Sequence, residues 1–199
     1  MTRVGLRERK KVETRSRILR SAVDLFGRNG TDAVSVEDVA IHADVGKGTV
    51  YNYFNAKEDM LAAFVIELDR EALRGFRDLA CTGTLAEALD AAAWRLLECK
   101  SGYRPFVQVF LARALTSPPL HRELTEFQAS LDAALEDLFD ELRERGLVRA
   151  DFHCGELILA FKTLELGLTS LWAMEGPPYD DARRMTRLLT TALAKEIGS

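Results

Sequence analysis

The chain has 199 residues, of which 47% are hydrophobic and 29% charged, a balance that fits a folded globular protein and excludes low-complexity and fibrous chains. The sequence predicts neither a secretion signal nor an apolar run of about 18 residues that would span a membrane. Three widely spaced cysteines without a CxxC pair argue against a disulfide framework or a zinc finger, and they favour a reducing cytoplasm.

The net charge of −4 is distributed unevenly along the chain. Residues 1–20 carry 8 basic and 2 acidic side chains, and residues 1–58 carry 11 basic and 8 acidic ones. The remainder is acidic, so we expect only one end of the chain to meet a polyanion. A solvated, disordered arm would have the same composition, and charge alone leaves both interpretations open.

Apolar residues recur at helical spacing along almost the whole chain, without sustained alternation of period two, so the prediction is an all-α fold. The first helix is expected over residues 14–28, with Thr14 as its cap and Gly30 as the residue that ends it.

Three more helices are expected close behind the first. The second begins at Ser35, whose spacing to Asp38 resembles a capping box. A tight turn follows, then a third helix over residues 47–54, and a fourth whose cap is expected to be Asn55. Five further helices are predicted between segments rich in Gly, Pro or capping residues. Their expected ranges are 84–100, 104–116, 119–145, 154–175 and 178–197.

The second and third helices together form a helix-turn-helix pattern, in which the second helix of the pair enters the DNA major groove. The spacing alone is weak evidence, because helical hairpins are common. The third helix strengthens it, since Val50 and Phe54 face inward and leave tyrosines and polar groups outside. Such side chains suit contacts with phosphates and base edges. They are Lys47, Thr49, Tyr51, Asn52 and Tyr53.

The block from Thr14 to about Leu61 resembles the TetR family of transcriptional repressors. The resemblance is carried by ILRSAVDLFGRNGTDAVSVEDVA and GKGTVYNYFNAKEDML. It implies a three-helix DNA-binding head fused through helix four to a C-terminal helical domain for ligand binding and dimerisation. Beyond residue 65 the resemblance is limited to the layout of nine helices.

The resemblance also implies which residues contact DNA. They are Thr14, Ser35, Lys47, Gly48, Thr49, Tyr51, Asn52, Tyr53 and Lys57. Thr14 and Ser35 are included because they are hydroxyl residues at helix N-termini, where backbone N–H groups and the helix dipole favour a phosphate. Ser35 could equally be a plain helix cap, Tyr53 a half-buried packing residue and Lys57 a surface lysine.

Three positions depart from the family's pattern. Asp44 stands where the turn usually has glycine, although aspartate tolerates the left-handed region better than most residues. Gly46 replaces a common serine cap, which removes a hydroxyl contact. Glu37 stands where some relatives have a basic residue, and it is either neutral or a reader of a cytosine amino group.

We divide the chain accordingly into a basic arm at 1–13, a helix-turn-helix domain at 14–58 and a ligand-binding and dimerisation domain at 59–199. The arm is expected either to be frayed or to reach toward the DNA backbone or minor groove and add salt-dependent affinity.

The last two helices carry apolar stripes that suit a four-helix bundle with a second copy of the chain, as the resemblance also implies. The alternative is that both stripes are intramolecular core. The predicted interface residues are Leu157, Phe161, Leu164, Leu168, Leu171, Trp172, Met185, Leu188, Leu189 and Ala192.

The resemblance further implies a regulatory cavity in the C-terminal domain. The predicted lining residues are Leu68, Trp94, Leu97, Phe106, Phe110, Arg113, Phe127, Gln128, Leu131, Phe161 and Glu165. Each could instead be ordinary core. The aromatic content favours an apolar or aromatic effector, and Arg113 or Lys162 could meet an anionic head group.

The resulting prediction is a cytoplasmic, ligand-responsive transcriptional regulator. We expect a repressor that binds double-stranded DNA at a palindromic operator as a homodimer and is released by a small apolar or aromatic effector. We expect no enzyme activity, cofactor, metal or membrane partner, because the sequence shows no catalytic motif and His153, Cys154 and Glu156 lack a distant ligand partner. The alternative is a helical ligand carrier or protein-interaction module whose helix-turn-helix is structural only.

Overall fold

The computed structural model describes residues 5–81, 83–176 and 179–199. The described residues form helices without a β-strand, which confirms the predicted all-α fold. The helices are α1 (Leu6–Asn29), α2 (Val36–His42), α3 (Lys47–Tyr51), α4 (Lys57–Ala72), α5 (Leu85–Glu98), α6 (Arg104–Ala114), α7 (Pro118–Glu144), α8 (Cys154–Glu175) and α9 (Tyr179–Ile197). Two short 3-10 turns, η1 (Arg77–Ala80) and η2 (Ser101–Tyr103), lie before and after α5.

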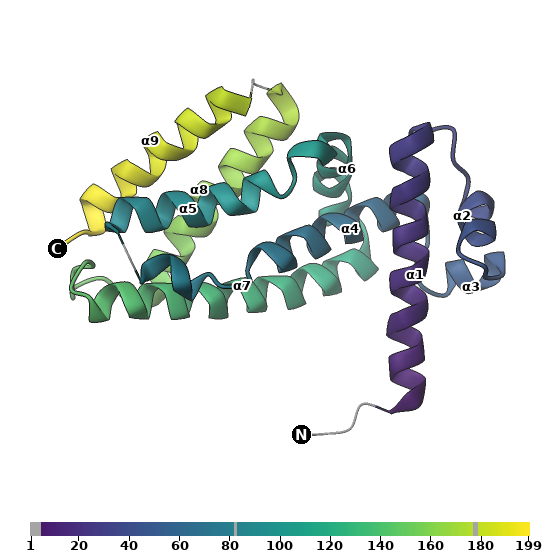
Figure 1. The fold of residues 1–199 in the computed structure, drawn as a ribbon, viewed down its shortest axis with the longest axis horizontal. Coiled ribbons are helices and arrows are strands. Elements are labelled where there is room, and N and C mark those ends of the chain that lie inside the picture. Colours follow the sequence, from purple (N-terminus) through teal and green to yellow (C-terminus); the bar gives the residue numbers. More distant parts are fainter. Residues whose placement is uncertain (1–4, 82, 177–178) are drawn as a thin grey trace.

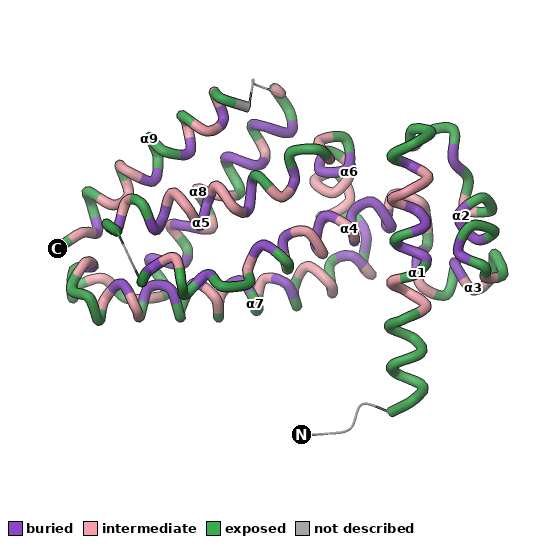
Figure 2. Tube along the Cα trace, in the orientation of Figure 1, coloured by how far each residue is buried: buried purple, intermediate pink, exposed green. Residues whose placement is uncertain are grey.

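Helices α1–α3 form a head at one end of the molecule, and α4 leads from the head into a longer helical body (Figure 1). Within the body, α4 packs against α6 and α7, and α5 packs against α9. The N-terminal half of α1 extends beyond the rest of the head, and its residues 5–13 are exposed (Figure 2).

The first helix starts earlier than predicted, at Leu6 instead of Thr14. The segment before Thr14 consists mainly of strong helix formers without Gly or Pro, so helical structure continues back to Gly5. Thr14 therefore lies inside a helix and caps nothing, and the predicted arm continues α1 as far as Leu6. Residues 1–4 of that arm lie outside the described residues.

Local capping chemistry accounts for most of the other head boundaries. The predicted capping box of α2 is confirmed, because the Ser35 hydroxyl accepts a hydrogen bond from the Asp38 N–H at 3.2 Å and the Ser35 N–H donates to the Asp38 carboxylate at 2.8 Å. Asp44 has a φ of 51°, in the left-handed region that the turn before α3 requires. The predicted cap at Asn55 is wrong, since Ala56 occupies that position without a side-chain hydrogen bond.

Two hydrophobic clusters fill the molecule, and α4 contributes to both. Leu61 and Val65 pack in the head cluster, whereas Ile66 packs in the body cluster. The head cluster also contains Phe106 from α6 and Trp172 from α8. Head and body therefore share packed side chains, so a displacement of α6 or α8 would also displace side chains of the head.

Helix α8 corrects the expectation that no segment is apolar enough to cross a membrane. It has 22 residues, and an 18-residue window within it reaches a mean hydropathy of 1.4. Length and composition do not distinguish a membrane span from the core helix of a soluble protein. Here α8 packs against α5, α6, α7 and α9, and its Lys162 and Glu165 form ion pairs with Asp132 of α7 and with Lys100 in the turn after α5.

Candidate DNA-binding head and effector cavity

Helix α3 presents a polar surface on one side and is anchored by one buried residue on the other. Val50 is completely buried, whereas Lys47, Gly48 and Asn52 are exposed and Thr49 is half-buried. Tyr51 keeps 47% of its surface exposed, a large fraction for an aromatic side chain with an apolar ring. The arrangement leaves one tyrosine ring and several hydrogen-bonding groups available to a ligand outside the protein.

Two predicted contact residues are engaged within the protein. Tyr53 is partly buried against the head cluster. The Lys57 ammonium donates hydrogen bonds to the carbonyl oxygens of Thr31 at 2.7 Å and Val34 at 3.4 Å. Both residues thus hold the head together, and a role for either in phosphate binding remains a prediction.

Lys47 forms an ion pair with Glu37 across the helix-turn-helix, with 2.9 Å between the ammonium nitrogen and a carboxylate oxygen. Both side chains are exposed, and the hydrogen bond and charge of Glu37 raise the pKa of Lys47. The sequence drew attention to Glu37 as an unusual acid, but it did not predict this pairing. An acid next to α3 weakens the positive potential at the surface of that helix.

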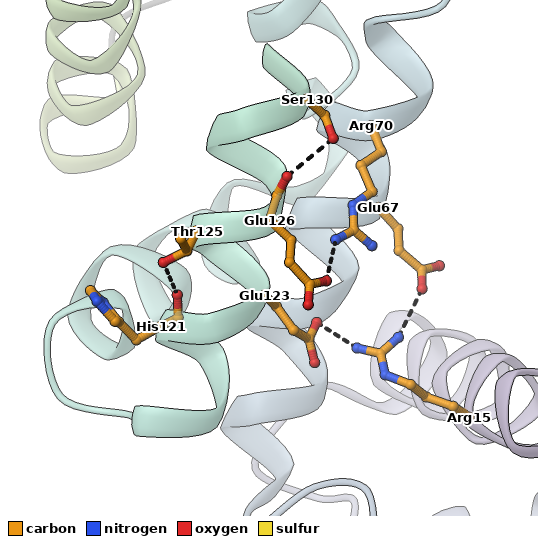
Figure 3. A network of polar contacts seen from close by, with 8 residues as sticks. All are labelled: Arg15, Glu67, Arg70, His121, Glu123, Thr125, Glu126 and Ser130. Atoms are coloured by element: carbon orange, nitrogen blue, oxygen red, sulfur yellow. Dashed lines mark hydrogen bonds and ion pairs between the residues drawn. The ribbon is translucent and has the colours of Figure 1, made fainter. Parts of the chain in front are cut away.

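Arg15 ties the head to the body (Figure 3). From α1 its guanidinium reaches Glu67 on α4 at 3.1 Å and Glu123 on α7 at 2.6 Å, and it lies over the Phe54 ring. Arg70 approaches Glu126 nearby, at 3.7 Å. These contacts span three helices and depend on tertiary structure, so sequence reasoning had no local signal for them.

Asp59, at the start of α4, forms a second connection between head and body. Only 4% of its surface is exposed, and one carboxylate oxygen accepts hydrogen bonds from the Arg113 guanidinium at 2.7 and 3.1 Å and from the Ser117 hydroxyl at 3.1 Å. Its other oxygen is buried and has no hydrogen-bond partner among the described residues. The end of α6 and the cap of α7 are thereby linked to the helix that carries the head.

A cavity of about 440 Å³ lies between α6, α7 and α8. Its lining residues are Asp69, Lys100, Phe110, Leu111, Ala114, Leu115, Leu124, Phe127, Gln128, Leu131, Leu159, Lys162, Thr163, Glu165, Leu166 and Thr169. The volume falls in the range of small-molecule sites, roughly 300–1,000 Å³. Five residues predicted as lining are among them, namely Phe110, Phe127, Gln128, Leu131 and Glu165.

The structure places the other six predicted lining residues away from this cavity. They are Leu68, Trp94, Leu97, Phe106, Arg113 and Phe161. Leu97 and Phe106 belong to the head cluster and Phe161 to the body cluster. Trp94 lies under the guanidinium of Arg183, and Arg113 binds Asp59. A helical stripe shows that a residue faces inward, but not whether it meets another side chain or an empty space.

A charged cluster lines the inner wall of the cavity. Lys100 is 2% exposed, and its ammonium donates to Asp69 at 2.5 Å and to Glu165 at 3.3 Å. The Thr169 hydroxyl donates to the same Glu165 oxygen at 2.7 Å. Burial raises the pKa of Asp69 to about 6, against the lowering effect of Lys100.

The pKa of Lys100 shows whether burial or the neighbouring carboxylates have the larger effect. Burial lowers the pKa of Lys100, but the attraction of Asp69 and Glu165 outweighs it and raises the pKa above its ordinary value. Lys100 therefore stays charged at neutral pH. Of Lys100, Asp69 and Glu165, the sequence indicated only Glu165, because Lys100 and Asp69 lie at separate places in the chain without a motif around them.

The predicted dimer face is corrected in part. Leu157, Phe161, Leu168 and Trp172 are buried within the single chain. Leu164 is partly buried against the body cluster. The described large apolar residues that α8 and α9 leave exposed are Leu159, Leu166, Leu171, Met174, Leu188 and Leu189, of which Leu159 and Leu166 line the cavity. Helix α8 is apolar on more than one side. Its most regular apolar stripe faces the core, and other apolar side chains of the helix are exposed.

Residues 18–64 match a sequence model described as bacterial regulatory proteins, tetR family. The match covers the C-terminal half of α1, all of α2 and α3, and the first half of α4, the helix that leads from the head into the body. The chain belongs to the TetR family.

Curated relatives of this TetR-family chain include UidR of Escherichia coli K12, described as an HTH-type transcriptional regulator, with 26% identity over 123 residues. That alignment covers 58% of this chain and 63% of UidR, so the chain spans less than two thirds of that relative. YhgD of Bacillus subtilis, an uncharacterised HTH-type transcriptional regulator, is 23% identical over 174 residues, which is 85% of this chain and 89% of YhgD.

Solved structures share the fold over nearly the whole chain. FadR of Thermus thermophilus, a transcriptional repressor in complex with lauroyl-CoA, is 25% identical with a TM-score of 0.70, covering 92% of this chain and 93% of FadR. GusR of Salmonella enterica is 24% identical with a TM-score of 0.65, covering 92% of this chain and 96% of GusR, and supports the fold alone.

Proposed function

We propose that this chain is a cytoplasmic, ligand-responsive transcriptional repressor that binds an inverted-repeat operator as a homodimer. The observation that carries the proposal is the exposed face of α3 within the region that matches the family. Lys47, Tyr51 and Asn52 there combine a charge, an aromatic ring and an amide. Such groups supply phosphate contacts, which position a protein on DNA, and base-edge contacts, which give specificity.

The cavity supports a small effector with a largely apolar body. Phenylalanine and leucine side chains make up half of its lining, and Asp69, Lys100, Glu165 and Thr169 form one polar cluster in it. FadR of Thermus thermophilus, which shares the fold, was solved with lauroyl-CoA bound. For the present chain we propose the wider class of small amphipathic molecules.

A route from the cavity to the head runs along α6. Phe110, Leu111 and Ala114 line the cavity, and Arg113 between them holds Asp59 at the start of α4. An effector that fits better when α6 is displaced would therefore favour a different position of α4 and of the head. The shift in DNA affinity equals the difference in effector affinity between the two states, typically about 1–3 kcal/mol.

The alternative function, a helical ligand carrier or interaction module, predicts no specific DNA binding. We would test the two with duplexes from the DNA flanking the chain's own gene, chosen for an inverted repeat and measured by fluorescence anisotropy at several salt concentrations. We expect tight, steeply salt-dependent binding of the inverted repeat and at least about 10³-fold weaker binding of a scrambled duplex. Equal, weak binding of both duplexes would contradict the proposal.

Dimerisation gives a second prediction. Met174 and Leu188 are 67% and 69% exposed, and neither lines the cavity. Each apolar side chain buried between two copies contributes roughly 1.5–3 kcal/mol, so the double substitution Met174→Glu/Leu188→Glu should weaken the dimer by at least about 100-fold. Light scattering after size exclusion should change from twice the chain mass of 22.2 kDa to that mass itself.

Ile41→Glu provides the matched control, because Ile41 is a similarly exposed apolar residue on α2 in the head. It should leave the dimer intact. A dimer that persists in the double variant and dissociates in the control would place the interface elsewhere.

A further inference from the structure

The inner wall of the cavity has an excess of negative charge. Asp69 and Glu165 are paired with the single ammonium of Lys100. Lys162, the other lysine of the lining, is 2.6 Å from Asp132 and is thereby neutralised. Counted together with Asp132, which lies outside the lining, these groups are three carboxylates and two ammoniums, so one carboxylate is uncompensated, and the rest of the lining is largely apolar.

The unused hydrogen-bonding capacity on this wall also lies with the carboxylates. Lys100 and Cys99 donate to one oxygen of Asp69, and Lys100 and Thr169 donate to one oxygen of Glu165. Within the described residues, the second oxygen of each carboxylate accepts no hydrogen bond. Burial raises the pKa of the Cys99 thiol to about 12, so the thiol stays neutral and does not offset the charge.

An anionic ligand has little to bind here. The Lys100 ammonium is almost completely covered and already contacts two carboxylates, so an incoming carboxylate would have to displace one of them. It would also face the remaining acid at short range, and like charges brought together in a desolvated site cost affinity. A ligand with a positive charge and N–H donors would instead be attracted by these carboxylates and could donate to their free oxygens.

We propose that the effector is a lipophilic amine, protonated at neutral pH, whose ammonium donates to the free oxygen of Glu165. Its hydrocarbon or aryl body lies against Phe110, Phe127 and Leu131. Glu165 is the favoured acceptor because its side chain is 16% exposed, compared with 8% for Asp69. This inference rests on the proposed effector function and specifies the chemistry of that site.

Three probes that share one body and differ in the head group test the inference. They are phenylbutylamine, phenylbutanol and phenylbutyrate, titrated into the full chain by isothermal calorimetry at neutral pH. We expect the amine to bind about tenfold more tightly than the alcohol, and the carboxylate to bind most weakly.

The substitution Glu165→Gln should weaken amine binding about tenfold and leave alcohol binding within about twofold, because it removes the charge but keeps the shape. Glu175→Gln is the control, since it removes an exposed acid from the same helix outside the cavity. It should change neither affinity. Alcohol binding by Glu165→Gln also shows that the variant is folded.

The outcomes separate this inference from the function on which it rests. If the alcohol or the carboxylate binds as tightly as the amine, the inference fails while an effector cavity stands. An unaltered preference for the amine in Glu165→Gln also overturns it. If none of the three probes binds, both the inference and the effector part of the proposed function fail, whereas DNA binding by the head stays a separate measurement.

Discussion

Replacing Lys100 with methionine should lower the free energy of unfolding by about 3–5 kcal/mol, the usual cost of removing one partner of a buried ion pair. Lys100 and Asp69 are 2% and 6% exposed, so water cannot replace the lost ammonium. Two carboxylates would then face each other without the charge that holds them together. At roughly 2–4 °C per kcal/mol, the melting temperature should fall by roughly 6–20 °C.

A second substitution distinguishes lost charge balance from lost packing. The double variant Asp69→Asn/Lys100→Met removes both charges of the closest pair and should recover a large part of the stability. Lys47→Met is the control, because it removes a lysine from an exposed ion pair and should leave the urea midpoint unchanged. A Lys100→Met midpoint equal to that of the unsubstituted chain would show that the cluster adds no stability.

The pH dependence of this effect has a definite sign. Burial raises the pKa of Asp69 from an ordinary 3.8 to about 6, so between these values the native state holds more protons than the unfolded state. Stability due to this group is therefore lost as the pH rises from about 4 to about 6. The contribution of Lys100 changes in the same direction but at higher pH, since its raised pKa contributes stability that is present at neutral pH and lost only in strong alkali.

Without Lys100 the pKa of Asp69 loses its main lowering influence and rises further. The penalty of ionising the buried acid then extends to neutral pH. Urea unfolding should accordingly show a smaller difference between Lys100→Met and the unsubstituted chain at about pH 5 than at about pH 8. An equal difference at both pH values would contradict this account of the cluster.

Local chemistry explains which features could be predicted from the sequence. The capping box at Ser35, the left-handed turn residue Asp44 and the bounds of α8 depend on neighbours within a few residues, and sequence reasoning identified them correctly. The predicted start of α1 was wrong. Thr14 could cap a helix, but the residues before it are themselves good helix formers, so the helix begins earlier, at Leu6.

Features that depend on distant residues were missed. Lys100 and Asp69 are separated by 31 residues and meet only after α4 and α5 have packed. In α8 the side chains at Leu157 and Leu168 form the more regular stripe, but whether it faces the core or a partner is decided by α5 and α7. Periodicity identifies the helix, and tertiary packing decides which of its apolar sides stays outside.

Replacing Tyr51 with alanine should weaken operator binding about tenfold to a hundredfold, the range for losing one good contact with base edges. The ring is 47% exposed, so the substitution removes little from the head cluster, in which the neighbouring Val50 is completely buried. The fold and the affinity for a scrambled duplex should therefore change little. Anisotropy with both duplexes and a thermal melt of the variant would measure the three quantities.

Glu37→Gln is the matching variant of opposite sign. It removes the carboxylate that occupies Lys47, so the ammonium becomes free to neutralise a phosphate. Binding of both duplexes should tighten, and the slope of log K against log salt should steepen by about one.

The two variants together separate base reading from charge. Tyr51→Ala should act on the operator alone, whereas Glu37→Gln should act on any duplex. If Glu37→Gln instead weakens the operator and spares the scrambled duplex, then Glu37 accepts from a cytosine amino group, and its pairing with Lys47 belongs to the free protein only. If Tyr51→Ala weakens both duplexes equally, the exposed ring contacts the backbone, and base recognition must come from other residues of the head.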